Sequence, residues 1–280
     1  MPTIYGNNSN NSLNGTSSSD LIYGQAGSDN LYGNGGNDVI YGGTGSDVAY
    51  GGIGDDWLCG EDGNDKLFGD DGQDYLSGGA GDDGLTGGLG DDYLFGDTGD
   101  DSLTGGLGDD YLVGGAGIDI LVGEDGNDKL FGDDGQDYLS GRARDDGLTG
   151  GLGDDYLFGD TGNDVLNGGA GNDILTGGTN RDFFYFNSLS DGIDRITDFS
   201  VIDDTIQVNR SAFRLSANGT ILSNQFSIGS SASSASHRFI YNSVTGAFFF
   251  DVDGSGSAAQ VQLALLNTGL SLTNNDVIAV

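Results

Sequence analysis

Aspartate recurs at every ninth residue through most of this chain. Nineteen of these aspartates follow one another in a single register, with no insertion or deletion between them. They are Asp20, Asp29, Asp38, Asp47, Asp56, Asp65, Asp74, Asp83, Asp92, Asp101, Asp110, Asp119, Asp128, Asp137, Asp146, Asp155, Asp164, Asp173 and Asp182. Carboxylate oxygens are hard ligands, and calcium accepts about six to eight oxygens at irregular geometry. The spacing therefore indicates a row of calcium sites, provided that the fold brings successive aspartates together.

Other residues repeat with the same nine-residue period. With Gly24 taken as position 1 of a unit, these aspartates are at position 6, and position 8 is apolar in all twenty units from Leu13 to Phe184. Positions 7 and 9 are chemically mixed. Because successive residues of a strand point to opposite faces, we expect each unit to end in a three-residue strand whose middle side chain is buried.

Positions 1 to 6 carry most of the 55 glycines. Glycine enters left-handed backbone conformations without steric cost, so these positions are expected to reverse the chain. Two units would then complete one coil and add one strand to each of two parallel sheets. Units two apart would lie side by side, which places Asp38 near Asp56. Two carboxylates that close repel each other unless a cation lies between them.

Two alternatives compete with calcium at position 6. Magnesium fits less well because it requires strict octahedral geometry and keeps its water. The aspartates could also do no more than cap turns, where aspartate is common. Turn capping would allow Asn or Ser at position 6 as well, and neither occurs in the nineteen units. The pattern therefore favours calcium.

The composition is strongly acidic, with 44 acidic and 9 basic side chains and a formal net charge of −35. This charge disfavours binding to nucleic acid or to an anionic membrane surface. One buried apolar residue per unit cannot offset the conformational entropy lost when a glycine-rich chain becomes ordered. We therefore expect a disordered chain without calcium and a folded one with it.

The nine-residue unit also matches a known signature. Seventeen consecutive units between Gly24 and Thr176 follow G-G-x-G-x-D-x-U-x, the calcium-binding nonapeptide of RTX proteins. The chain resembles these proteins, and the resemblance implies an all-β fold built on a parallel β-roll that binds multiple Ca²⁺ ions. We expect residues 1–23 to form degenerate N-terminal cap repeats and residues 24–185 to form the roll.

The pattern ends at Arg181, where glycine becomes less frequent and aromatic residues appear. The segments RITDF, TIQVN, RFIYN, AFFFDV and VQLALL indicate strands of a small C-terminal β domain over residues 186–280. The stretches GIDRITDFSVIDDTIQV and RFIYNSVTGAFFFDVDGSGSAAQVQLALL, with the terminal DVIAV, resemble the C-terminal domain of serralysin-type secreted metalloproteases. The resemblance implies an uncleaved C-terminal signal for a type I secretion apparatus, and hence a secreted or cell-surface protein.

Three local features bear on these expectations. The N-terminal MPTIYGNNSN lacks the basic and apolar regions of a signal peptide, and no apolar run is long enough to span a membrane. Residues 60–99 recur at 123–162 with Gly79 and Gly81 replaced by Arg142 and Arg144, so the turn at 141–146 either holds a guanidinium in place of an ion or has decayed. In DVDGSG, Asp251 and Asp253 begin like an EF-hand loop, but position 12 is Gln262 instead of Glu, which favours an ordinary tight turn.

No catalytic constellation is evident. The single histidine, His237, excludes an H-E-x-x-H zinc site, and no nucleophile elbow precedes a helix, so we expect no enzyme. Two functions remain. One is a secreted calcium-binding protein that is structural or adhesive at the cell surface, with cell-envelope polysaccharide as a candidate partner. The alternative is a calcium-dependent accessory or export module of a secreted enzyme or haemolysin-like system.

Overall fold

The computed structural model describes residues 1–280, and nearly all of its regular secondary structure is β-strand. Two three-residue 3-10 helices, η1 (Ser223–Gln225) and η2 (Asn274–Asp276), are the exceptions. The chain divides into two compact units, Met1–Gly147 and Leu148–Val280. No helix has the length and apolar character needed to cross a membrane.

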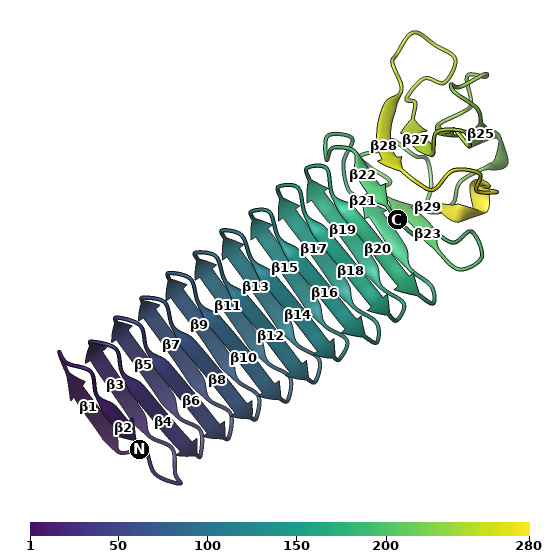
Figure 1. The fold of residues 1–280 in the computed structure, drawn as a ribbon. Coiled ribbons are helices and arrows are strands. Elements are labelled where there is room, and N and C mark those ends of the chain that lie inside the picture. The colour runs from purple at the N-terminus through teal and green to yellow at the C-terminus, as the bar shows by residue number, and fades with distance from the viewer. The chain divides into compact units, whose positions relative to one another are not determined.

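The first unit is a stack of parallel strands (Figure 1). Its strands are β1 (Thr3–Asn7), β2 (Ser12–Asn14), β3 (Leu21–Ala26), β4 (Asn30–Gly35), β5 (Val39–Thr44), β6 (Val48–Ile53), β7 (Trp57–Asp62), β8 (Lys66–Asp71), β9 (Tyr75–Ala80), β10 (Gly84–Leu89), β11 (Tyr93–Thr98), β12 (Ser102–Leu107), β13 (Tyr111–Ala116), β14 (Ile120–Asp125), β15 (Lys129–Asp134) and β16 (Tyr138–Ala143). Odd-numbered strands form one sheet and even-numbered strands the other. Within the unit, each strand from β1 to β14 pairs in parallel with the strand 18 residues later, as Ile40 does with Leu58. The predicted parallel β-roll with two units per coil is confirmed.

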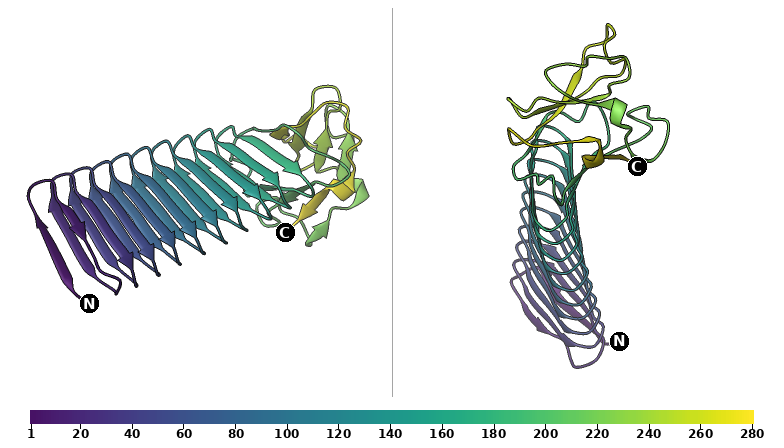
Figure 2. Two further views of the ribbon diagram at one scale, coloured as in Figure 1. Left: turned by 60° about the horizontal axis from the view of Figure 1, so that its bottom comes forward. Right: turned by 90° about the vertical axis from the view of Figure 1, so that its right-hand side faces the viewer.

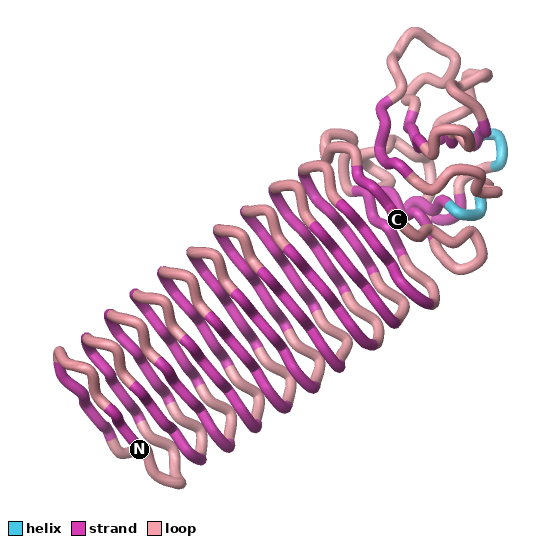
Figure 3. The backbone as a smooth tube through the Cα atoms, in the orientation of Figure 1, coloured by secondary structure: helices cyan, strands magenta, loops and turns pink.

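The strands are longer than the sequence pattern suggested. From β3 on, each strand of the first unit has six residues and covers positions 7 to 9 of one unit and 1 to 3 of the next. Position 2 takes a left-handed conformation, with φ of 110° at Gly43 and 73° at Asp70, yet both residues keep their place in the sheet register. The left-handed residue bends the strand without ending it, so the turn is confined to positions 4 to 6 (Figure 3).

The core of the first unit is the predicted row of position-8 side chains. These residues are 0–1% exposed from Ile22 to Leu139. Complete burial of each contributes about 1.5–3 kcal/mol. Aromatic side chains at the outward positions stack between coils, with ring centroids 5.2 Å apart for Tyr23 and Tyr41 and 4.1 Å apart for Trp57 and Tyr75. These stacks add to the parallel pairing on the outer face.

The second unit joins the last repeats to the C-terminal segment. Its strands are β17 (Gly147–Leu152), which begins one residue before it, β18 (Tyr156–Thr161), β19 (Val165–Ala170), β20 (Ile174–Thr179), β21 (Phe183–Phe186), β22 (Asp194–Ile196), β23 (Thr205–Val208), β24 (Gly219–Thr220), β25 (Phe226–Ile228), β26 (Phe239–Tyr241), β27 (Ala247–Phe250), β28 (Val261–Leu265) and β29 (Val277–Ala279). Four of the five segments expected to be strands beyond Arg181 contain one, and the fifth, RITDF, overlaps β22. Strand β22 pairs with β20, and β23 pairs with β21.

The C-terminal strands have an aromatic core of their own. Phe213, Phe239 and Phe250 are buried and lie with ring centroids 5.0–6.1 Å apart. The last strand, β29, pairs with β23 in parallel and with β24 antiparallel. The DVIAV segment is therefore part of a sheet in the folded chain. The colour change from green to yellow in Figure 2 marks these last strands.

Candidate metal centre

The nineteen aspartates all lie at the end of a turn and directly before a strand. Their exposure is only 0–4%. The preceding turn depends on position 4, where Gly45 and Gly54 have φ of 125° and 131°. A Cβ on Gly45 would lie 2.4 Å from the carbonyl oxygen of Gly27. Glycine at position 4 thus allows both the left-handed turn and the close approach of the neighbouring coil.

Successive aspartates meet across the coils, as the 18-residue circuit requires. The N–H of Asp38 donates to Oδ1 of Asp56 at 2.7 Å, and the N–H of Asp56 donates to Oδ1 of Asp74 at 2.8 Å. Such bonds, 2.6–2.9 Å long, connect each aspartate from Asp20 to Asp128 with the one 18 residues later. In the second unit Asp155 and Asp164 donate in the same way to Asp173 and Asp182.

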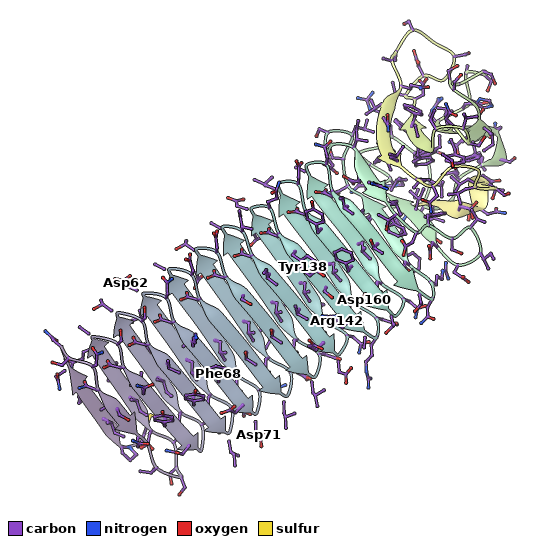
Figure 4. All side chains as sticks on the ribbon, viewed as in Figure 1. Asp62, Phe68, Asp71, Tyr138, Arg142 and Asp160 are labelled. Atoms are coloured by element: carbon purple, nitrogen blue, oxygen red, sulfur yellow. The ribbon has the colours of Figure 1, made fainter.

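These bonds form two aspartate ladders in the first unit, one at each row of turns. The turns at the opposite ends of β8 end in Asp65 and Asp74, which belong to different ladders. Asp62 and Asp71, which precede these two turns, lie at opposite edges of the unit in Figure 4. Asp20 departs from the pattern because the residue 18 before it, Pro2, has no N–H to donate, and its Oδ2 accepts from the Thr16 N–H instead.

The other carboxylate oxygen is buried without a hydrogen-bond partner. This is true of Oδ2 in all twelve ladder aspartates from Asp29 to Asp128, and again in Asp173 and Asp182. A buried, charged oxygen that lacks a partner costs several kcal/mol. So many unsatisfied oxygens in one register indicate a missing positive partner and not isolated packing defects.

The unsatisfied oxygens face glycine at position 1. A Cβ built on Gly51 would lie 2.3 Å from Oδ2 of Asp56 and 2.8 Å from the carbonyl oxygen of Gly69 in the next coil. Gly69 repeats the arrangement with Asp74 at 2.2 Å and Gly87 at 2.7 Å. Neither glycine has a left-handed φ, so glycine is needed here for space. A carboxylate oxygen and a carbonyl oxygen therefore flank one point beside each glycine, and this donor set suits calcium.

Burial and mutual repulsion make these carboxyl groups weak acids in the absence of a cation. Burial, with smaller contributions from the carboxylates of Asp74 and Asp38, raises the pKa of Asp56 to about 7. Burial and the neighbouring Asp110 and Asp74 raise the pKa of Asp92 to about 8. The hydrogen bonds from backbone N–H groups oppose this rise. A bound divalent cation would favour the charged forms.

No three or more His, Cys, Asp or Glu side chains converge in a group that could hold a metal ion. A calcium ion at the turns would therefore need main-chain carbonyl oxygens together with one or two carboxylates. Glycine-rich turns expose such carbonyls, and calcium uses them as ligands. The turns bring aspartate and carbonyl oxygens together, as at Asp56 and Gly69; that these oxygens are the calcium ligands remains a prediction.

Position-5 side chains form a further set of hydrogen bonds between coils, which was not predicted from the sequence. Oδ1 of Asp91 accepts from the N–H of Asp109 at 2.9 Å, and Oδ1 of Asp109 accepts from the N–H of Asn127 at 2.9 Å. These exposed side chains reach forward to the next coil, whereas the buried aspartates reach back. The signal is in the sequence, because every position-5 residue from Ser28 to Asp109 is Ser, Asn, Gln or Asp.

Two further aspartates beyond the last repeat continue the buried ladders. The N–H of Asp173 donates to Oδ1 of Asp194, and that of Asp182 donates to Oδ1 of Asp204. Both acceptors are buried, 3% and 7% exposed. They were missed because loops lengthen the spacing to 21 and 22 residues. The triplets Asp-Arg-Ile and Asp-Thr-Ile still keep aspartate two residues before a buried apolar residue.

The arginine-containing turn keeps its place in the ladder. Arg142 and Arg144 have left-handed φ of 80° and 85°, and Oδ1 of Asp146 accepts from the N–H of Asp128 at 2.8 Å. Arg142 is paired in register with Glu124 on the adjacent strand. Substitution of an ion by the guanidinium remains a prediction.

Comparison with known protein families identifies the nine-residue repeats. The sequence model of the RTX calcium-binding nonapeptide repeat, in four copies, matches residues 5–40, 32–67, 50–85, 60–94, 86–121, 113–148 and 149–184. The chain belongs to the RTX calcium-binding nonapeptide repeat family. Its repeats are calcium-binding repeats, as the aspartate register predicted.

Other comparisons add little to the family assignment. One solved structure with similarity is the AlgE6R3 subunit of the Azotobacter vinelandii mannuronan C5-epimerase, at 23% identity over 61% of this chain and 78% of that one. Its TM-score is 0.23, too low to support an argument. No curated protein matches the chain.

Proposed function

We propose that this RTX chain is a secreted, non-catalytic calcium-binding protein that folds when calcium fills the turns of its roll. In this proposal the nineteen position-6 aspartates supply carboxylate oxygens, and carbonyls of the glycine-rich turns complete the sites. Calcium supplies positive charge between oxygens that otherwise repel one another. The observation that carries the proposal is the row of buried, partnerless Oδ2 atoms, each facing a position-1 glycine.

The same arrangement explains why calcium would control folding. Each position-1 glycine lies beside a carboxylate of its own coil and a carbonyl of the next coil, as Gly51 does with Asp56 and Gly69. An ion bound there joins two coils that, without it, hold a buried negative charge between them. Binding free energy is then folding free energy, because the oxygens come together only when the coils stack.

The domain limits and the route of export are part of the proposal. We assign residues 1–23 to N-terminal cap repeats, residues 24–185 to the roll, and residues 186–280 to a serralysin-like C-terminal β domain. The last residues would be read by a type I secretion apparatus before the chain folds. The pairing of β29 with β23 and β24 supports this order of events, because recognition of the segment would require it to be free of the sheet.

A structural or adhesive role at the cell surface is supported by the outer face of the first unit. Tyr5, Trp57 and Tyr93 are 64%, 44% and 51% exposed on the odd-numbered sheet. Exposed aromatic side chains offer apolar contact to a partner such as cell-envelope polysaccharide.

The test of calcium-dependent folding is a titration of calcium-free protein with circular dichroism and Trp57 fluorescence. Trp57 precedes β7's buried Leu58 and follows Asp56, so its emission reports on one ladder position. Calcium should produce the β signal and shift the Trp57 emission together, while magnesium at the same concentration should not. A full β signal at neutral pH in excess EDTA would refute the proposal.

A further inference from the structure

The loop after β27 holds a pair of aspartates that the repeats do not use. Asp251 directly follows the core strand β27 and is only 4% exposed. One of its oxygens, Oδ1, accepts from the N–H of Asp253 at 3.2 Å. Its Oδ2 makes no hydrogen bond, and the residue lines an open cavity together with Gly254, Ser255 and Gly256. A nearly buried carboxylate therefore has an oxygen available at this cavity.

The second aspartate of the loop has the same deficiency. Oδ2 of Asp253 accepts from the N–H of Ala258 at 3.0 Å, but its Oδ1 is buried with no partner. Neither aspartate forms an ion pair. Arg238 lies beside Asp251, whose N–H donates to the Arg238 carbonyl at 2.7 Å, but the Arg238 guanidinium donates to the carbonyls of Ala235 and His237 instead. Two carboxylates thus lie two residues apart with no cationic side chain paired to either. The buried Oδ1 of Asp253 is costly unless a cation binds, and Asp251 offers a second oxygen at the cavity.

The loop is shaped to keep the Asp253 carboxylate in place. A Cβ on Gly256 would lie 2.2 Å from Oδ2 and 2.9 Å from Oδ1 of Asp253, so any other residue at 256 would displace this carboxylate. Gly254 has φ of 68°, and the main chain at Ser234 lies so close that a Cβ on Gly254 would be 2.4 Å from the carbonyl oxygen of Ser234. Both glycines are needed for this conformation.

We propose that Asp251 and Asp253 form a calcium site in the C-terminal segment, separate from the nonapeptide repeats. The order Asp251, Asp253, Ser255 and Gly256 matches positions 1, 3, 5 and 6 of a calcium-binding loop. Position 12 is Gln262, which lies in β28 and is paired with Phe249, so the bidentate glutamate of such loops is lacking. Water and carbonyl oxygens would complete the shell, and two carboxylates give an affinity in the millimolar class of extracellular sites.

Ion counting by native mass spectrometry tests this site in the full-length protein at saturating calcium. Asp253→Asn and Gly256→Ala should each bind one calcium ion fewer than wild type. Ser257→Ala is the matched control, because this exposed side chain makes no hydrogen bond, and it should bind as many ions as wild type. Two variants guard against local misfolding, since they remove the site by different routes: one removes charge and the other displaces the carboxylate.

Hydrogen exchange followed by mass spectrometry supplies the local measurement. Peptides covering residues 247–262 should exchange more slowly when calcium is added to wild type and to Ser257→Ala, and should lose this protection in the two site variants. Equal ion counts in all four proteins, or calcium protection of the loop that persists in Asp253→Asn, would overturn the proposal. Failure of the repeats to bind calcium would be a different result, because the wild-type ion count would then be one or none.

Discussion

Replacement of a position-1 glycine by alanine should remove a calcium site without forcing the substituted residue into an unfavourable φ. We choose Gly69→Ala in β8. Gly69 has an ordinary φ, so alanine is accepted by the main chain, but its Cβ would lie 2.2 Å from Oδ2 of Asp74 and 2.7 Å from the carbonyl oxygen of Gly87. Contacts below 3.0 Å are essentially never seen for Cβ, so both the Asp74 carboxylate and the Gly87 carbonyl of the next coil must move away from the point where the oxygens meet.

The magnitude follows from linkage. A ligand that binds only the folded state stabilises it by RT ln(1 + [L]/Kd), which is about 2.7 kcal/mol at 100 times Kd and about 1.4 kcal/mol at ten times Kd. Loss of one ion should therefore lower the free energy of unfolding of Gly69→Ala by about 2.7 kcal/mol at high calcium. This decrease in the free energy of unfolding should become smaller as the calcium concentration is lowered, because calcium binding then contributes less to stability.

The control is Gly84→Ala, at an outward position of β10. Gly84 also has an ordinary φ, and the atoms nearest to its added Cβ lie at 3.9 and 4.0 Å. Alanine here should be neutral or stabilising by about 0.4–1 kcal/mol, because it restricts the unfolded chain. Urea unfolding at several fixed calcium concentrations and an ion count by native mass spectrometry compare the two. If both variants bound the same number of ions and unfolded alike, the position-1 glycines would not define the sites.

Three further perturbations test the charges and the core. In EDTA, burial and neighbouring carboxylates raise the folded-state pKa of Asp56 and Asp83 to about 7, well above the unfolded value. The stability linked to these protons is complete below about pH 4 and is lost as pH rises through 7. Circular dichroism should therefore show more β structure at pH 4.5 than at pH 8, and a decrease on acidification would contradict the assignment. Asp92→Asn keeps an acceptor for the Asp74 N–H but removes the charge, so it should increase β content in EDTA and lose one ion in calcium; a variant with unchanged ion count would show that Asp92 is not a ligand. Leu76→Ala should cost about 2–5 kcal/mol in urea unfolding because it opens a cavity at a fully buried position, with no change in the number of ions bound at saturating calcium.

The repeat alone was enough to predict the coil, the buried row and the aspartate register. A strict nine-residue period with apolar residues such as Leu58 and Leu76 at one position leaves few ways to bury them, and parallel pairing 18 residues apart is the one observed. The predicted strand length of three residues was wrong because the sequence pattern assigns every glycine to a turn. Residues such as Asp70 and Asp97 take left-handed φ at position 2 while still pairing in the sheet, and composition does not reveal this.

Features outside the period were harder to predict from the sequence. Asp194 and Asp204 take the position of the next ladder aspartate after loops of irregular length, so a search at nine-residue spacing passes over them. The DVDGSG segment was predicted to be an ordinary turn because Gln262 replaces the expected glutamate, and that stays a prediction. What the sequence could not reveal is the buried Oδ1 of Asp253, which has no partner in the structure.

Asp194 and Asp204 also show why the last coil of a repeat array needs a hydrogen-bonding partner after it. Each buried aspartate donates its N–H to the carboxylate of the next coil, so the last coil must find an acceptor elsewhere or bury an unsatisfied N–H. In the second unit Asp194 and Asp204 supply that acceptor to Asp173 and Asp182, and the residues after them pair with the last repeat strands. The C-terminal strands therefore satisfy the same hydrogen-bonding requirement that each coil satisfies for the one before it.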